Sequence, residues 1–329
     1  MKYSAGEKYE IIKMVENSNL SVKRTLQQID ISKSTFYSWY RRYLEDGIEG
    51  LESQNRCPKQ FWNRIPDKER DVIADTALDY PEQSCREIAF KIIDENGYFV
   101  SESSVYRILR EKNLISSPVF TVISAKDKFQ NPTTHINELW QTDFTYFKII
   151  TWGWYYLSTV MDDFSRFILA WKLCTSMKSE DVMETLDMAI AETGIENVKV
   201  IQKPRLLSDN GPCYISSSLH DYLDDNKIRH TRGRPYHPMT QGKIERYHRS
   251  MKNVLLLDNY YSPSELEYHI GRWVDYYNFR RYHEAIGNVT PYDKYMGREE
   301  EIFKQRRQVK AATMQKRVQQ YRKELILSL

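Results

Sequence analysis

The strongest constraint in this sequence is a change of pattern after residue 135. Three runs rich in β-branched and aromatic residues follow, LWQTDFTYFKIITW, WYYLSTVMDDFSRFILAWKL and VKVIQKPRLLSDNG. Helical stretches lie between and after them, at 179–193 and 216–225. Strands interleaved with helices indicate a central mixed sheet, so we predict an α/β or α+β domain over residues 136–300, called here the sheet domain.

The pattern before residue 116 is helical. Apolar residues at helical spacing, with Ser or Gly at the ends, predict three short helices in residues 1–50, the last being KSTFYSWYRRYLEDG. Residues 66–115 repeat the arrangement and end in SVYRILREKN. This is the layout of a helix-turn-helix, whose last helix enters the DNA major groove. We call these segments the first and second helical units.

The aromatic residues of these helices have a second interpretation, since at helical spacing they also suit the core of a small bundle. A packed core leaves the polar face free, so the two interpretations are compatible. From the exposed faces we predict four DNA contacts, namely Arg41, Arg42, Arg107 and Arg110.

Three further segments connect or follow these domains. Residues 51–65 form a linker that is either a minor-groove arm or an ordinary connection, carrying Arg56, Pro58 and Lys59. Residues 116–135 form a polar connector. Residues 301–329 predict a basic helix with one partly apolar stripe, made of Val318, Tyr321 and Leu325. Subunit contact, DNA contact and a frayed tail remain open for it.

Charge and cysteine content limit the class of protein. The chain has 48 basic and 45 acidic side chains, so a nucleic-acid surface has to come from local clustering. Residues 229–252 supply such a cluster, with seven basic side chains and one acid. The four cysteines show no CxxC pairing, and the longest uncharged run, 149–161, is too short for a membrane helix. We therefore expect a cytoplasmic protein without a zinc module or membrane contact.

Three acidic residues stand in unusual surroundings. Asp143 lies inside an apolar strand, where a carboxylate is costly unless it is paired or bound to a cation. Asp209 ends a strand and is followed by a turn, and Glu245 lies in the predicted helix TQGKIERYHRSMK. Spacing alone is weak evidence, because several pairs of acids share these separations by chance. The surroundings of each acid carry the prediction.

At these residues the chain resembles a known family, the DDE transposases of bacterial insertion sequences, whose core is similar to retroviral integrases. The resemblance rests on WQTDFTYF, LLSDNGPCYIS, HPMTQGKIERYHRSMK and YYNFRRYHEAIGNVTPYDKY. It implies an RNase H-like fold, a mixed five-stranded sheet with flanking helices, preceded here by all-α helix-turn-helix units. The histidine/cysteine zinc module of retroviral integrases has no counterpart in the sequence.

The resemblance also implies the roles of particular residues. Asp143, Asp209 and Glu245 are expected to be catalytic and to converge as ligands of two Mg²⁺ ions, with Mn²⁺ able to substitute. Lys252 matches the basic position of the catalytic helix that contacts DNA. Its neighbours on that helix complete the expected DNA contacts, namely Gln241, Lys243, Arg246 and Arg249.

Other residues near the acids receive plainer interpretations. Asp162 and Asp163 are expected to serve a turn, and Cys213 to serve packing. His237 and His248 are expected to be structural or solvated. Arg280, Arg281 and His283 are compatible with either a DNA track or a brace of the domain.

The function expected from these features is that of a transposase. It would bind element ends as an oligomer assembled on double-stranded DNA, cleave strands with metal ions, and transfer the 3′-hydroxyl. Two alternatives are a non-catalytic DNA-binding regulator with a decayed core and a plain metal-dependent nuclease.

Overall fold

A computed structural model describes residues 3–18, 20–52, 61–115, 133–195, 203–233 and 241–327. The proposed arm residues, most of the connector, Arg234 and His237 lie outside these ranges. The chain divides into two compact units. Residues 1–62 hold the first helical unit, whereas the second helical unit and the sheet domain both fall within residues 63–329.

The first helical unit forms the three predicted helices, α1 (Ala5–Glu16), α2 (Val22–Gln28) and α3 (Lys33–Asp46), followed by a short 3₁₀ turn, η1 (Glu49–Leu51). The Ser32 hydroxyl accepts the Thr35 N–H at the start of α3, and Gly47 ends the helix at a φ of 65°. A positive φ favours glycine at this position. The aromatic residues Phe36 and Trp39 are buried with apolar residues of the other helices, so the core interpretation of this face is confirmed.

The second helical unit consists of α4 (Asp67–Asp79), α5 (Cys85–Glu95) and α6 (Glu102–Glu111). A capping box opens α5, with the side chains of Ser84 and Glu87 each bonding the other's backbone N–H. Its small core is closed by side chains from all three helices, among them Ile73, Ile92 and Val105.

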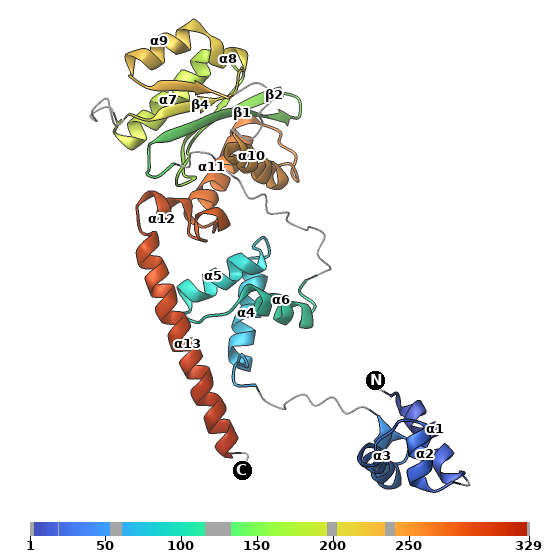
Figure 1. Ribbon diagram of the computed structural model, residues 1–329. Helices are drawn as coiled ribbons and strands as arrows, with labels where there is room; N and C mark the ends of the chain where they lie inside the picture. The colour runs from blue at the N-terminus through green and yellow to red at the C-terminus, as the bar shows by residue number, and fades with distance from the viewer. Residues whose placement is uncertain are drawn as a thin grey trace. The chain divides into compact units, whose positions relative to one another are not determined.

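The sheet domain contains a mixed five-stranded sheet in the order β3-β2-β1-β4-β5 (Figure 1). Strands β1 (Leu139–Ile149), β2 (Gly153–Asp162) and β3 (Ile168–Cys174) form an antiparallel meander. Strands β4 (Arg205–Ser208) and β5 (Arg229–Arg232) run parallel to β1. This topology confirms the RNase H-like fold class.

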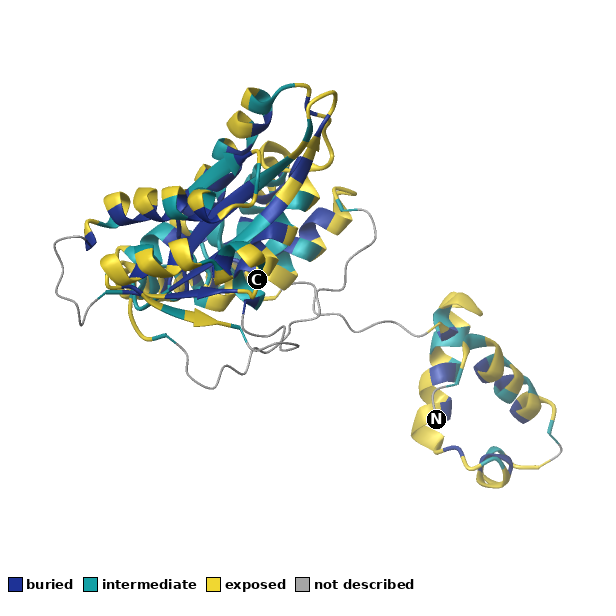
Figure 2. Ribbon diagram, turned by 90° about the horizontal axis from the view of Figure 1, so that it is seen from above, coloured by how far each residue is buried: buried dark blue, intermediate teal, exposed yellow. Residues whose placement is uncertain are grey.

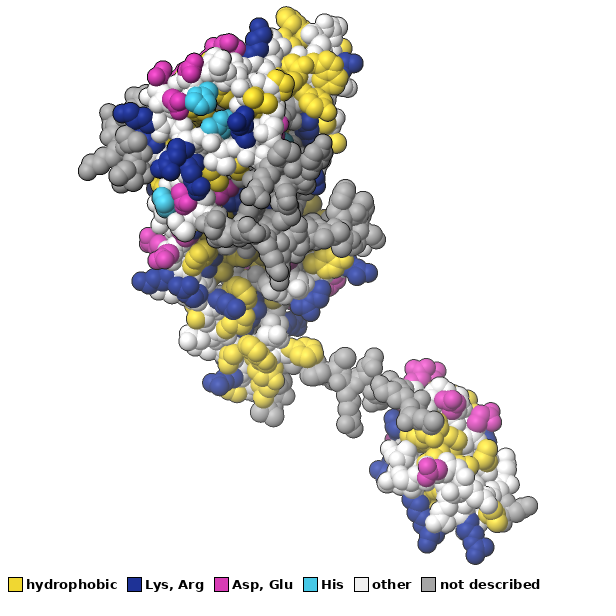
Figure 3. All heavy atoms as spheres, turned by 45° about the horizontal axis from the view of Figure 1, so that its top comes forward, with side chains coloured by type: hydrophobic (Ala, Val, Ile, Leu, Met, Phe, Trp, Pro, Cys, Tyr) yellow, Lys and Arg dark blue, Asp and Glu magenta, His cyan; other side chains and the backbone are white. Residues whose placement is uncertain are grey.

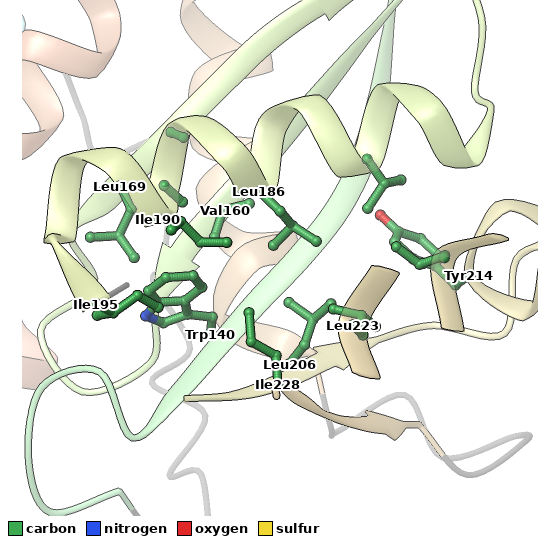
Figure 4. Close-up of a cluster of buried hydrophobic side chains, with 14 of the residues drawn as sticks. Trp140, Val160, Leu169, Leu186, Ile190, Ile195, Leu206, Tyr214, Leu223 and Ile228 are labelled. Carbon is green, nitrogen blue, oxygen red and sulfur yellow. The ribbon is translucent and has the colours of Figure 1, made fainter. Parts of the chain in front are cut away.

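Helices cover both faces of this sheet, and each face has its own core. On one face α7 (Ser179–Thr193), α8 (Pro212–Ile215) and α9 (Ser217–Asp225) pack over Trp140, Val160 and Leu206 (Figure 4). On the other face lie α10 (Gly242–Leu255) and α11 (Pro263–Phe279), whose core includes Phe147 and Leu157. Figure 2 shows the buried residues concentrated where helices and strands meet. Alternate residues of β1 therefore serve different cores.

The chain leaves the sheet domain through η5 (Glu284–Ile286), α12 (Pro291–Tyr295) and a long final helix, α13 (Glu299–Leu327). The predicted C-terminal helix is confirmed, but its packed stripe is different from the predicted one. The buried residues are Arg306, Thr313 and Arg317, whereas Leu325 is 41% exposed. The contact face is polar, so hydropathy could not reveal it.

Candidate functional site

Asp143 lies in β1, the middle strand of the sheet, which is flanked by β2 and β4. Its side chain is 20% exposed, and Oδ2 lies 3.4 Å from Nδ1 of His248 on α10. Its residue opposite on β2 is Thr159, whose hydroxyl lies 3.3 Å from Nε2 of the same imidazole. The carboxylate therefore faces α10 from the sheet.

Asp209 follows β4 directly and lies beside Asp143 because of the strand register. In the parallel pair β1–β4, Gln141 is aligned with Leu207, so each aspartate lies two residues beyond an aligned position. β4 ends just before Asp209, whereas β1 continues past Asp143 to Ile149, so Asp209 lies at the carboxyl end of its strand, a place where open α/β sheets bind ligands. The sequence prediction that these two residues converge is thus supported by the register.

The turn after Asp209 holds its carboxylate in place. Oδ1 accepts the Gly211 N–H at 2.8 Å, and the Asn210 side chain donates to the Gly233 carbonyl at 2.8 Å. A Cβ at Gly211 would lie 3.0 Å from Oδ1, so a larger residue would crowd the carboxylate.

The charges of the two carboxylates influence one another. Burial raises the pKa of Asp209, the Gly211 N–H partly opposes this, and the charge of Asp143 raises the pKa further. Two carboxylates that destabilise each other's charge are stabilised together by a cation.

Glu245 is exposed in the first turn of α10. It lies on the same helical stripe as Gln241, His248 and Lys252, since these positions are separated by four, three and four residues. Each of these other three interacts with the strand that carries Asp143. The backbone of α10 therefore places Glu245 at the border of the face turned toward the aspartates.

The predicted convergence of all three acids is only partly present. Among the described residues, no group of three or more His, Cys, Asp or Glu side chains is gathered closely enough to hold a metal ion. Asp143 and Asp209 are paired by the sheet, whereas the glutamate side chain remains in solvent. Three gathered carboxylates repel one another, which favours an outward rotamer for the exposed one.

Lys252 lies one helical turn beyond His248, in reach of the charge of Asp143. Its Nζ lies 4.0 Å from the centre of the Tyr146 ring, a cation–π geometry. Burial lowers the pKa of Lys252, and Asp143 opposes that shift. This position suits a cation that meets a phosphate beside the carboxylates.

Two of the predicted DNA contacts are engaged inside the protein. The Lys243 side chain is 8% exposed and pairs with Asp163, Nζ to Oδ2 at 2.5 Å. Gln241 is buried and donates to the carbonyls of Thr142 and Leu207. Their burial and these partners argue against the predicted DNA contact for both residues.

Arg246 and Arg249 are exposed on α10, as a DNA contact requires. The Nε atom of Arg246 donates to the Gly242 carbonyl at 2.8 Å, within the first turn of the helix. The roles of both arginines stay predictions.

The plainer interpretations of Asp162 and Cys213 are supported, whereas the Asp163 carboxylate binds Lys243, Gln141 and Thr133 from other parts of the chain. Asp162 accepts the backbone N–H and the hydroxyl of Ser165, which is the turn role expected for it. Cys213 packs against the core beneath α7, and burial raises its pKa to about 11.

His248, expected to be structural or solvated, is buried between Thr159 and Asp143, which agrees with the structural role. The signal that could have identified it is its place on the Glu245 stripe, three residues further along the helix.

The exposed basic residues of the helical units are where the sequence predicted them. Arg41 on α3, with Arg107 and Arg110 on α6, are exposed, and Arg42 is half-buried. In Figure 3, Lys and Arg side chains of the first helical unit project from one side and acidic side chains from another. Over the sheet domain in the same view, basic, acidic and histidine side chains are interspersed.

Comparison with protein families identifies the domains. An integrase core domain matches residues 133–238, and a second model of the same description matches 226–291. Homeodomain-like domains match residues 2–52 and 35–109. These matches confirm the resemblance of the chain to integrase-core proteins with helix-turn-helix units.

Individual relatives agree with the domain matches. The chain is 27% identical over 274 residues to the transposase for transposon Tn552 of Staphylococcus aureus, covering 77% of this chain and 56% of the relative. It is 28% identical over 158 residues to a putative transposase for insertion sequence element IS986/IS6110 of Mycobacterium tuberculosis, covering 47% of this chain and 56% of the relative. The matched segments thus span little more than half the length of these relatives.

A solved structure of the integrase catalytic core domain of HTLV-2, in complex with magnesium, shares 23% identity at a TM-score of 0.38. The alignment covers 48% of this chain and 96% of that structure. Within the described part of this chain, no helix has both the length and the apolar composition to span a bilayer.

Proposed function

We propose that this chain, which carries an integrase core domain behind helix-turn-helix units, is a DNA transposase that cleaves strands at element ends and joins them to target DNA. The observation that carries the proposal is the proximity of Asp143, inside β1, to Asp209, just past the end of β4, on the side of the sheet that faces the Glu245 stripe of α10.

The donor set fits hard divalent cations. Its members are all carboxylates, which Mg²⁺ prefers and which Mn²⁺ accepts as well. Asp143, Asp209 and Glu245 would hold the ions, and Glu245 has to turn inward from solvent to join them. When bound, two such ions would activate the attacking oxygen and stabilise the leaving oxygen.

The remaining residues of the site bind and orient DNA. Lys252 would contact a phosphate beside Asp143, and Arg246 and Arg249 would continue this contact along α10. His248 would position Asp143 against α10, since its Nδ1 lies 3.4 Å from Oδ2 of that carboxylate. The chemistry requires no covalent protein nucleophile, so we assign none.

The helical units supply the recognition of DNA ends. Two helix-turn-helix units in one chain suit a long asymmetric site, with Arg41, Arg42, Arg107 and Arg110 as the proposed contacts. Action at two element ends implies an oligomer assembled on DNA, and a cytoplasmic location at the nucleoid follows from such a substrate.

The proposal is tested with Asp143→Asn and Glu245→Gln, which keep side-chain size and remove the charge. We expect both variants to bind end DNA like the unaltered protein and to lose cleavage and joining by at least about a hundredfold. Glu267→Gln, an exposed change on α11, is the matched control and should retain activity.

The same assay separates the alternatives. A regulator with a decayed core would show no metal-dependent cleavage in any version of the protein. A plain nuclease would cut in Mg²⁺ but give no joined product. Cleavage that survives in Asp143→Asn would refute the assignment of this site.

A further inference from the structure

A guanidinium group on α13 joins the second helical unit to the sheet domain. Arg306 Nε and Nη2 donate to the two oxygens of Asp94 on α5, at 2.8 and 2.6 Å. Its Nη1 donates to the carbonyl of Asn288, in the loop before α12, at 2.8 Å. Arg306 thus joins α13, α5 and the sheet-domain loop, and it is only 8% exposed.

Aromatic and hydroxyl groups enclose this junction. The guanidinium lies 4.6 Å from the Phe90 ring centre and 5.5 Å from that of Tyr282. The Tyr282 hydroxyl also donates to Asp94 at 3.0 Å. A bidentate, partly desolvated pair of this kind has a fixed geometry, unlike an exposed ion pair.

A second attachment lies further along α13, at the turn that leads into α6. Arg317 donates to the Tyr98 hydroxyl and to the Phe99 carbonyl, both at 2.8 Å. The Thr313 hydroxyl accepts the Phe99 N–H at 3.0 Å. Tyr98 and Phe99 lie between α5 and α6, just before the proposed recognition helix begins at Glu102.

The two attachments lie 11 residues apart on one helix, which is about 16 Å. One contact would permit rotation about itself, whereas two contacts on a continuous helix oppose it. Direct ion pairs add to the connection, Arg86 with Glu284 and Arg281 with Glu87. Meanwhile Arg107 and Arg110 on α6 stay exposed, so α13 holds the unit without covering its proposed DNA face.

The base of α13 is also fixed to the sheet domain. Lys294 at the end of α12 pairs with Glu299 at the start of α13, at 2.6 Å. Gly287 has a φ of 82°, and a Cβ there would lie 2.5 Å from the ring of Phe303 on α13. The helix is therefore packed at its base as well as along its length.

From this arrangement we propose that α13 is a molecular spacer: it fixes the second helical unit relative to the catalytic carboxylates and so determines how far from its recognised sequence the protein cuts DNA. This inference rests on the proposed function, because it requires both recognition by α6 and cleavage at the sheet domain. Arg306 and Arg317 act in it as positioning residues that touch neither DNA nor the reacting atoms.

The first test needs no DNA. Hydrogen–deuterium exchange is compared in the full chain for Arg306→Ala, Arg317→Ala and the matched control Arg307→Ala, whose side chain is exposed on the same helix. We expect amides of residues 94–101 to exchange about tenfold faster in the first two variants and unchanged in the control. Arg306→Lys, which keeps the charge without the bidentate fork, should fall between them.

The second test measures where DNA is cut. A duplex selected from a random pool for binding is labelled, and 5 base pairs are inserted between the bound segment and the cut. The unaltered protein should cut at one fixed distance from the bound segment. Arg306→Ala and Arg317→Ala should bind the duplex with similar affinity but spread the cuts over neighbouring phosphates. Arg307→Ala should cut like the unaltered protein.

Several results would contradict the proposal that α13 is a spacer. These are unchanged exchange in both variants, faster exchange with cuts still at one position, or complete loss of cutting, since a loosened spacer misplaces cuts and does not abolish them. Failure of the unaltered protein to cut would instead refute the proposed function. In that case the exchange data still decide whether α13 holds the second helical unit.

Discussion

At the residue scale, the environment of a charged side chain decided its role more than its identity did. Lys243 and Arg246 both lie in the first turns of the helix that carries Glu245, and both were expected to contact DNA. The first is buried against Asp163 and the second is exposed. Their different surroundings predict opposite consequences of substitution.

Lys243→Ala should destabilise the protein by about 3 kcal/mol, because the buried Asp163 carboxylate keeps its hydrogen bonds from Gln141 and Thr133 but loses its counter-charge. Arg246→Ala should change stability by less than about 0.5 kcal/mol. Urea unfolding at neutral pH measures both. A similar, small effect of the two substitutions would show that the Lys243 pair contributes little.

His283 provides a test of pH dependence. Burial of its ring, with Arg281 and Arg166 nearby, lowers its pKa from 6.5 to about 3. The unfolded chain therefore binds the proton first as pH falls below 6.5, so this contribution to stability is present above that pH and is lost toward pH 3.

His283→Phe keeps a ring against Tyr277 but cannot titrate. Between pH 7 and pH 5 the unaltered protein should lose about 1–2 kcal/mol more stability than this variant. Urea unfolding at the two pH values gives the comparison. Equal losses in the two proteins would indicate that the imidazole is not protected from protonation in the fold.

At the scale of elements, caps and periodicity placed the helices where the sequence indicated. In α3, Ser32 and Gly47 mark the two ends, and the aromatic face is buried. The rest of the helix surface carries the exposed Arg41 and the half-buried Arg42, so the helix has one packing face and one basic face, as a recognition helix needs.

Arg42→Ala should weaken binding of end DNA and reduce the salt dependence of the binding constant by about one unit of slope. Lys13→Ala, on α1 and paired with Glu16, is the control in the same helical unit. Titrations at several salt concentrations provide the slopes. If the affinity and slope of Arg42→Ala match those of the control, α3 does not contact DNA through this residue.

At the scale of the whole molecule, the chain consists of two compact units that fold on separate cores. The first helical unit is closed by its own residues, including Ile12, Leu26 and Leu51. The second helical unit, by contrast, is bound to the sheet domain through the polar face of α13.

Deletion of residues 1–62 should therefore leave the rest of the chain folded, with its melting temperature within about 2 °C of the value in the full chain. Residues 1–62 should in turn unfold in a separate transition. Calorimetry of the full chain and of the shortened one tests this. If the full chain unfolds in a single transition, and the shortened chain no longer shows that transition, the two units depend on each other for folding.

The sequence by itself determined the local elements and the mixed sheet, and it singled out the three acids as candidates. Each depends on signals contained in a few neighbouring residues, such as caps, period-2 runs and a carboxylate in an apolar strand. The resemblance to integrase-core transposases rested on such short segments too, and the domain matches confirmed it.

Only the tertiary structure decided which polar groups meet. The sheet register pairs Asp143 with Asp209, the packing of α10 buries Lys243 and His248, and Arg306 joins three elements that are far apart in sequence. Hydropathy and spacing predict which residues of a single helix or strand are buried. Whether a charge is buried with a partner depends on residues from other elements, and that information exists only in the folded chain.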